Sequence, residues 1–117
     1  MGILLAMERT TIDLLQGTLG VLILKSVSGG PLHGYGIARW IEQVTGDEVL
    51  IEDGSLYPAL HRLQAMKLLT SEWGVSDSGR RVKRYTITEQ GRGQLRAESQ
   101  RWARFSTAVS RALGARA

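Results

Sequence analysis

The chain has 117 residues, 43% of them hydrophobic, which is typical of one globular domain. It contains no cysteine, which excludes disulfides, thiolate nucleophiles and cysteine metal sites and suits a reducing cytoplasm. No apolar run approaches the roughly 20 residues that cross a bilayer. The two histidines, His33 and His61, have no third partner at metal-ligand spacing, so we expect no zinc site and no other cofactor.

The net charge of +4 is unevenly distributed along the chain. Residues 1–77 hold five basic and nine acidic side chains, whereas residues 78–117 hold ten basic and two acidic ones. One basic cluster consists of Arg80, Arg81, Lys83 and Arg84. Basic side chains on a flexible loop can lie along nucleic-acid phosphates. The alternative, if the cluster is considered by itself, is a solvated basic loop without a binding role.

The N-terminal part of the chain predicts an extension followed by a helix. Residues 1–11 lack the basic flank and the length of a secretory signal, and either Met1 or Met7 is the native start. Apolar residues at helical spacing then predict a first helix over about residues 12–28, which ends in turn chemistry over residues 28–31. These apolar residues are Leu15, Leu19, Leu22, Ile23 and Val27.

A second helix is predicted over about residues 34–45 and is closed by Gly46. Its inner stripe consists of Ile37, Ile41 and Val44, with Trp40 packing beside it. We expect His33 to bond to backbone at the helix start. Small residues on both sides of Tyr35, Gly34 and Gly36, would let the free N–H groups of this helix start approach a phosphate. The alternative for Tyr35 is a structural role as a half-buried side chain that supports the helix start, a half-buried brace.

Residues 51–67 predict a third helix with one buried face, made of Leu56, Leu60 and Leu63. We expect Asp53 or Gly54 as its N-cap and place Pro58 in the first turn, where the missing N–H has no partner in any helix. Its exposed polar residues are Ser55, Tyr57, His61 and Arg62. Leading turns of this kind face base edges in helix-turn-helix proteins; the alternative is a solvated polar face.

Two alternating segments, residues 69–74 and 82–88, predict a β-hairpin with a basic tip over residues 75–81. Trp73 closes the first strand, where we expect it to pack in the core or at a hinge. Three helices followed by a basic hairpin describe a winged helix-turn-helix. In such a fold the third helix enters the major groove and the hairpin reaches the adjacent backbone or minor groove.

The last predicted helix, over residues 91–113, carries apolar residues at a seven-residue repeat, with Thr88 as N-cap and Glu89 beside it. A seam of period 3.5 suits a partner helix, so we expect a dimer interface; the alternative is a helix folded back on its own domain. The expected interface residues are Leu95, Trp102, Phe105, Val109 and Leu113.

Six segments, in this order, resemble motifs of the PadR family of bacterial transcriptional regulators. They are residues 15–19, 30–37, 53–63, 72–74, 80–88 and Gly91, and the similarity covers about residues 12–113. The resemblance implies a homodimeric repressor that binds an inverted-repeat operator, often with ATGT and ACAT half-sites. It also implies the short subgroup with a single C-terminal helix, and release by a small aromatic or lipophilic effector. Paired copies of Trp102 would either stack on that effector or simply fill space.

The expected fold is mainly α with a β-hairpin (α+β): an N-terminal extension over residues 1–11, a winged domain over 12–88 and a dimerisation helix over 89–117. An enzyme is not expected, because Ser55, Tyr57 and His61 lie on one exposed helix without an orienting acid. The alternative function is a winged-helix protein-interaction module without sequence-specific DNA binding. The basic hairpin argues against it, since a protein-docking surface does not need four clustered cations.

Overall fold

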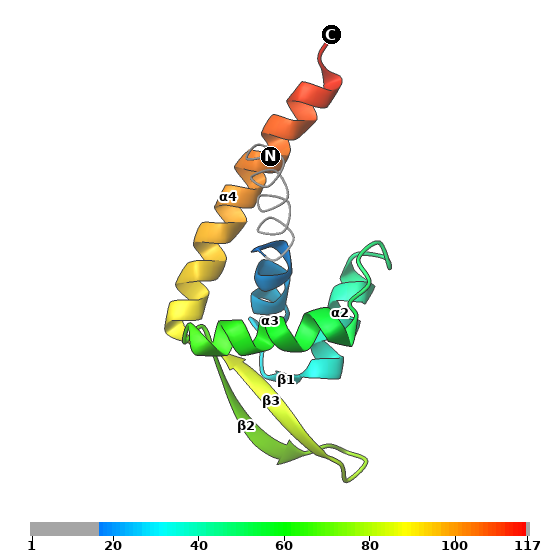
Figure 1. The fold of residues 1–117 in the computed structure, drawn as a ribbon, viewed down its shortest axis with the longest axis vertical. Helices are drawn as coiled ribbons and strands as arrows, with labels where there is room; N and C mark the ends of the chain where they lie inside the picture. The colour runs from blue at the N-terminus through cyan, green and yellow to red at the C-terminus, as the bar shows by residue number, and fades with distance from the viewer. Residues whose placement is uncertain (1–16, 117) are drawn as a thin grey trace, which may run out of the picture.

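The computed structural model describes residues 17–116. The first helix covers residues 17–26 of this part, and Leu15 lies outside the described residues. The elements that follow are β1 (Leu32–His33), α2 (Gly34–Val44), α3 (Asp53–Ala65), β2 (Leu69–Val75), β3 (Arg81–Ile87) and α4 (Glu89–Gly114). The β2–β3 hairpin projects at one end of the molecule and the C-terminal end of α4 at the other (Figure 1). The predicted winged helix of α+β class is confirmed.

The three strands form an antiparallel sheet in the order β1-β3-β2. The hairpin register pairs Leu69 with Ile87 at its base and Val75 with Arg81 near its tip. The tip closes with a hydrogen bond from the Ser76 N–H to the Arg80 carbonyl at 2.7 Å. Gly79 adopts φ of 81°, a left-handed conformation that favours glycine. The hairpin was predicted, whereas the two-residue β1 strand was not, because so short a segment carries no alternation.

The core lies where the first helix, α2, α3 and the base of the hairpin meet. Its largest fully buried side chains are Ile23, Leu24, Val27, Ile37, Ile41, Leu56, Leu60 and Leu69. Burying each of them stabilises the fold by about 1.5–3 kcal/mol. The predicted α3 stripe is confirmed, and Trp40 packs against the core as expected. The prediction for Val44 is wrong: it is the last residue of α2 and is 58% exposed, whereas Ile41 in the same turn is fully buried.

The start of α3 differs from the prediction. Its N-cap is Glu52, whose carbonyl accepts from the N–H groups of Ser55 and Leu56 at 3.0 and 2.9 Å, and no side chain caps the helix. Pro58 is therefore the sixth residue of the helix and not part of its first turn. Since proline has no N–H, it cannot donate to the Gly54 carbonyl. Both residues are exposed, so water can satisfy that carbonyl.

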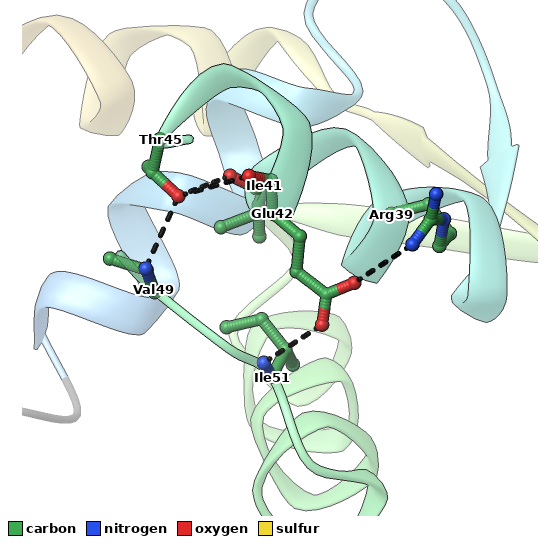
Figure 2. A network of polar contacts seen from close by, with 6 residues as sticks. All are labelled: Arg39, Ile41, Glu42, Thr45, Val49 and Ile51. Atoms are coloured by element: carbon green, nitrogen blue, oxygen red, sulfur yellow. Dashed lines mark hydrogen bonds and ion pairs between the residues drawn. The ribbon is translucent and has the colours of Figure 1, made fainter. Parts of the chain in front are cut away.

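The loop between α2 and α3 is held by two polar side chains, Glu42 in the last turn of α2 and Thr45 at its C-cap (Figure 2). The Thr45 hydroxyl donates to the Ile41 carbonyl at 2.8 Å and accepts from the Val49 N–H at 3.3 Å. The Glu42 carboxylate accepts from the Ile51 N–H at 3.2 Å and forms an ion pair with Arg39 at 3.7 Å. These bonds fix the backbone immediately before α3, and therefore where α3 begins.

The start of α4 is joined to the end of α3 through the loop before β2. The Thr88 hydroxyl accepts from the Gly91 N–H at 2.9 Å, which confirms the predicted N-cap, and donates to the Lys67 carbonyl at 2.8 Å. The Thr88 N–H donates to the Leu68 carbonyl at 3.1 Å. A Cβ on Gly91 would overlap the same Leu68 carbonyl oxygen and lie 2.8 Å from Ile87 Cγ1. Only glycine allows this approach.

We expect Gly91→Ala to destabilise the fold by about 1–3 kcal/mol, because α4 must shift away from the Leu68 carbonyl. The measurement is the free energy of unfolding in urea. Gly93→Ala is the matched control, since the nearest atom to its added Cβ is an Arg96 side-chain nitrogen at 3.9 Å. There alanine should stabilise the helix by up to about 1 kcal/mol. Equal effects of the two substitutions would contradict the packing role of Gly91.

Candidate nucleic-acid interface

An open groove of about 440 Å³ separates α3 from the β2–β3 hairpin, and we call it the wing groove. It is lined by His33, Gly34, Tyr35, Tyr57, His61, Trp73, Arg81, Val82, Lys83 and Tyr85. One wall comes from the start of α2 and the exposed face of α3, and the other comes from the hairpin. The groove thus brings together residues that the sequence analysis had assigned separately to a helix start, a recognition helix and a wing.

The start of α2 forms the first part of this wall. His33 is the N-cap, and its Nδ1 accepts from the Gly36 N–H at 3.0 Å, which confirms the predicted backbone bond. The Gly36 N–H is therefore not one of the free donors of this helix start, and phosphate binding by the remaining N–H groups stays a prediction. A Cβ on Gly34 would lie 3.1 Å from the Tyr57 hydroxyl oxygen, so Gly34 makes room for Tyr57. Tyr35 is 70% exposed and is not a half-buried brace.

The exposed face of α3 divides between two grooves. All five residues assigned to the recognition surface are exposed: Ser55, Tyr57, Pro58, His61 and Arg62. Tyr57 and His61 line the wing groove, whereas Arg62 lines a different groove, of about 380 Å³, together with residues of the first helix and α4. Tyr57 and His61 are therefore the residues of α3 that face the wing.

Tyr85 links the wing groove to the core. It is 6% exposed, and burial, with a smaller contribution from the neighbouring Tyr57 phenol, raises its pKa above the ordinary value of 10.0. A phenol with a raised pKa stays protonated and uncharged at neutral pH. Tyr85 therefore adds no charge to the end of the groove next to the core. The positive charges of Lys83 and Arg81 lie closer to the hairpin tip.

The alternation of side chains along β3 separates cations that are neighbours in the sequence. Arg81, Lys83 and Tyr85 alternate along β3 and share one sheet face, and Tyr85 turns that face toward α3. Arg84 lies on the opposite face, where its register partner is Glu72. Arg80 precedes β3 in the hairpin tip. Only Arg81 and Lys83 of these four line the wing groove.

Trp73 is the clearest departure from the sequence-based prediction. It was expected in the core or at a hinge, but its side chain is 59% exposed. Its ring centroid lies 4.7 Å from Arg81 Cζ and 5.9 Å from Lys83 Nζ, which are cation–π distances. The alternation from Leu69 to Trp73 places both on the core-facing side of β2. Trp73, however, lies on the part of the hairpin that extends beyond the core.

The long helix α4 leaves an apolar stripe exposed. Trp102, Phe105, Val109 and Leu113 are 46, 45, 39 and 83% exposed. Leu95, by contrast, is partly buried and packs against the core of its own domain. The first helix lies beside α4 (Figure 1), and an apolar groove of about 250 Å³ between them is lined by Val21, Leu22, Trp102 and Phe105, among others.

The structure gives no sign of a metal centre or a membrane span within residues 17–116. No three His, Asp or Glu side chains in this range lie close enough together to hold an ion. No helix in the same range is both long and apolar enough to cross a bilayer.

A cationic hairpin wall facing an exposed recognition-type helix is the arrangement of a DNA-binding winged helix. The profile of the family described as "Transcriptional regulator PadR-like family" matches residues 23–97. The chain belongs to the PadR-like family. PadR-like proteins are DNA-binding regulators of transcription, so this chain is not an enzyme.

Three relatives illustrate the likeness. A PadR-like transcriptional regulator from Bacillus cereus is 32% identical, with a TM-score of 0.73 and coverage of 89% of this chain and 99% of that one. A transcriptional regulator of Mycobacterium tuberculosis is 38% identical over 62% of this chain and 64% of its own length. A 37.1 kDa protein of a Streptomyces fradiae transposon is 39% identical over 76% of this chain, which spans only 24% of that protein.

The two faces of β3 should differ in their effect on DNA affinity. We expect Arg81→Ala to weaken binding to all DNA sequences alike and to reduce the slope of log affinity against log salt by about 0.9, the value for one lost phosphate contact. Arg84→Ala, which removes an equal charge from the opposite face, should change the slope less. Gel-shift titrations at several salt concentrations measure both variants. Equal slopes would contradict the assignment of the phosphate-binding face.

Proposed function

We propose that this PadR-like regulator is a repressor that binds an inverted-repeat operator as a homodimer. The observation that carries this proposal is the wing groove, in which Tyr57 and His61 of α3 face the cations of the hairpin. Tyr57 and His61 are the candidates for contacts with base edges, and Arg81 and Lys83 for contacts with phosphates. Ser55, Pro58 and Arg62 complete the exposed α3 surface, and Tyr35 at the start of α2 is a further phosphate contact.

The exposed stripe of α4 supports the dimer. Trp102, Phe105, Val109 and Leu113 continue along one helix beyond the domain core, and apolar side chains at this spacing are stabilised by a partner helix. The occupant we propose is the same stripe of a second copy, with Leu95 at its inner end. A two-fold axis would then present two copies of α3 to major grooves about one helical turn apart.

Repression and location follow from the same proposal. A dimer that occupies both half-sites of an operator blocks other proteins from that DNA. Such a protein acts in the cytoplasm, where the bacterial chromosome lies. A protein-docking role for the wing is less well supported, since Arg81 and Lys83 both line the groove beside α3.

The groove between the first helix and α4 is the site we propose for a small aromatic or lipophilic effector. Its volume of about 250 Å³ and its apolar lining suit a compact planar molecule. The rings of Trp102 and Phe105 lie 6.0 Å apart, centroid to centroid, and offer stacking surfaces. Because the stripe proposed for the dimer contains the same two residues, an effector bound there can alter the distance between the two copies of α3.

Selection from random double-stranded DNA should return a dyad-symmetric site, because two copies of α3 read the same half-site in opposite orientations. The half-sites expected from the family resemblance are ATGT and ACAT. Enrichment followed by sequencing measures this directly. A selected site without dyad symmetry would sink the operator proposal, and failure to enrich any sequence would favour the protein-interaction alternative.

A matched pair of variants separates the dimer from the DNA surface. Phe105→Arg introduces a charge into the stripe of α4 and should yield monomers that lose the preference for paired half-sites. Linked half-sites bind more tightly through effective concentration, which a monomer lacks. Arg104→Phe, at the neighbouring exposed position, is the control and should remain dimeric. Sedimentation velocity measures the oligomeric state.

Effector binding should quench the fluorescence of Trp102. In a Trp40→Phe/Trp73→Phe variant, Trp102 is the single emitter, and a planar probe such as anilinonaphthalene sulfonate should quench it. In Trp102→Phe, where Trp40 and Trp73 still emit, the same probe should leave the emission unchanged. Quenching that persists in Trp102→Phe would place the ligand elsewhere.

A further inference from the structure

Trp73 is a large aromatic side chain on the wing that the core does not use. Its 59% exposure means that most of its surface faces solvent, and two cations lie over its ring. The strand register explains their convergence. Lys83 is the cross-strand partner of Trp73, and Arg81 lies two residues away on the same strand and therefore on the same face.

We propose that Trp73 is a positioning residue for DNA binding: its indole ring holds Arg81 and Lys83 on the wall of the wing groove before DNA arrives. The inference rests on the proposed phosphate-binding role of the wing and names the residue that arranges it. Trp73 acts through the two cations and not by contacting a base. The ligand it serves is the phosphate backbone of double-stranded DNA.

The physical reason lies in the freedom of long side chains. Arginine and lysine on an exposed strand sample many rotamers, and binding a phosphate removes this freedom. A ring that already restrains both side chains lowers the entropy lost on binding, which is the general effect of preorganisation. Tryptophan provides the strongest cation–π attraction of the aromatic residues. Its electron-rich face also offsets the repulsion between two neighbouring cations that no acidic side chain of the wing groove neutralises.

The groove gives this restraint a direction. Arg81 and Lys83 line the same space as Tyr57 and His61, so cations held against Trp73 stay beside α3. Arg84 lies on the opposite sheet face, away from Trp73, and serves as the internal comparison. The Trp73 ring thus restrains Arg81 and Lys83, but not Arg84, in the position from which they can contact a duplex bound to α3.

Paired substitutions at Trp73 distinguish its aromatic character from its bulk. Trp73→Leu keeps an apolar strand residue but removes the π face, and should weaken binding to a non-specific duplex about two- to fivefold. Trp73→Phe should retain most of the affinity. The salt slope should stay unchanged in Trp73→Leu, because the same cations still reach the phosphates, whereas Arg81→Ala lowers it.

A double-mutant cycle then tests whether Trp73 acts through the cations. In an Arg81→Ala/Lys83→Ala background, Trp73→Leu should cause no further loss of affinity. A loss of the same factor in that background would overturn the inference, since the indole would then contact DNA itself or support the hairpin fold. If Arg81→Ala leaves the DNA affinity and the salt slope unchanged, the proposed role of the wing in phosphate binding is wrong. The inference about Trp73 is then wrong as well, because it rests on that role.

The free protein offers a readout that does not depend on DNA. Ring currents of the indole should shift the NMR signals of the Arg81 side-chain protons upfield, because the guanidinium lies 4.7 Å from the ring centroid. The shift should persist in Trp73→Phe and disappear in Trp73→Leu, while the Arg84 signals stay constant. Ordinary, unshifted Arg81 signals in the unmodified protein would overturn the inference.

Discussion

The contact between Gly91 and the Leu68 carbonyl is the constraint on which the arrangement of the molecule depends. It brings the first turn of α4 against the loop that joins α3 to β2, and Thr88 bonds to the same loop through both its N–H and its hydroxyl. The direction of α4 is therefore set relative to α3. Since α4 has 26 residues and is about 39 Å long, a small change of angle at this junction becomes a large displacement at Leu113.

The sequence predicted the elements and the buried stripe of α3 well, because periodic apolar residues report directly on burial. It predicted less well wherever one element must be placed against another. Val44 and Trp73 both follow the expected period, yet they lie where α2 ends and where the hairpin leaves the core. The period of apolar residues predicts which side of a helix or strand faces the core. It does not predict whether a neighbouring element extends far enough to cover that side.

The candidate site was found from sequence as a set of residues but not as an arrangement. Residue types and spacing pointed to Tyr57, His61 and the hairpin cations. Alternation along β3 already separates Arg81 and Lys83 from Arg84. Which of the two faces turns toward α3 depends on how the hairpin packs, which a motif does not encode. The capping bond of His33 was foreseen, but its consequence for Gly36 required the geometry of the α2 start.

That capping bond also determines which nitrogen of the imidazole carries hydrogen. Because Nδ1 of His33 accepts the Gly36 N–H, the ring proton of the neutral side chain resides on Nε2. His33 is the last residue of β1 and the N-cap of α2, and it also lines the wing groove. The capping bond therefore gives the groove a residue whose Nε2 carries the proton and can donate a hydrogen bond. The two nitrogens of one ring therefore differ in role: Nδ1 caps α2, and Nε2 remains a hydrogen-bond donor.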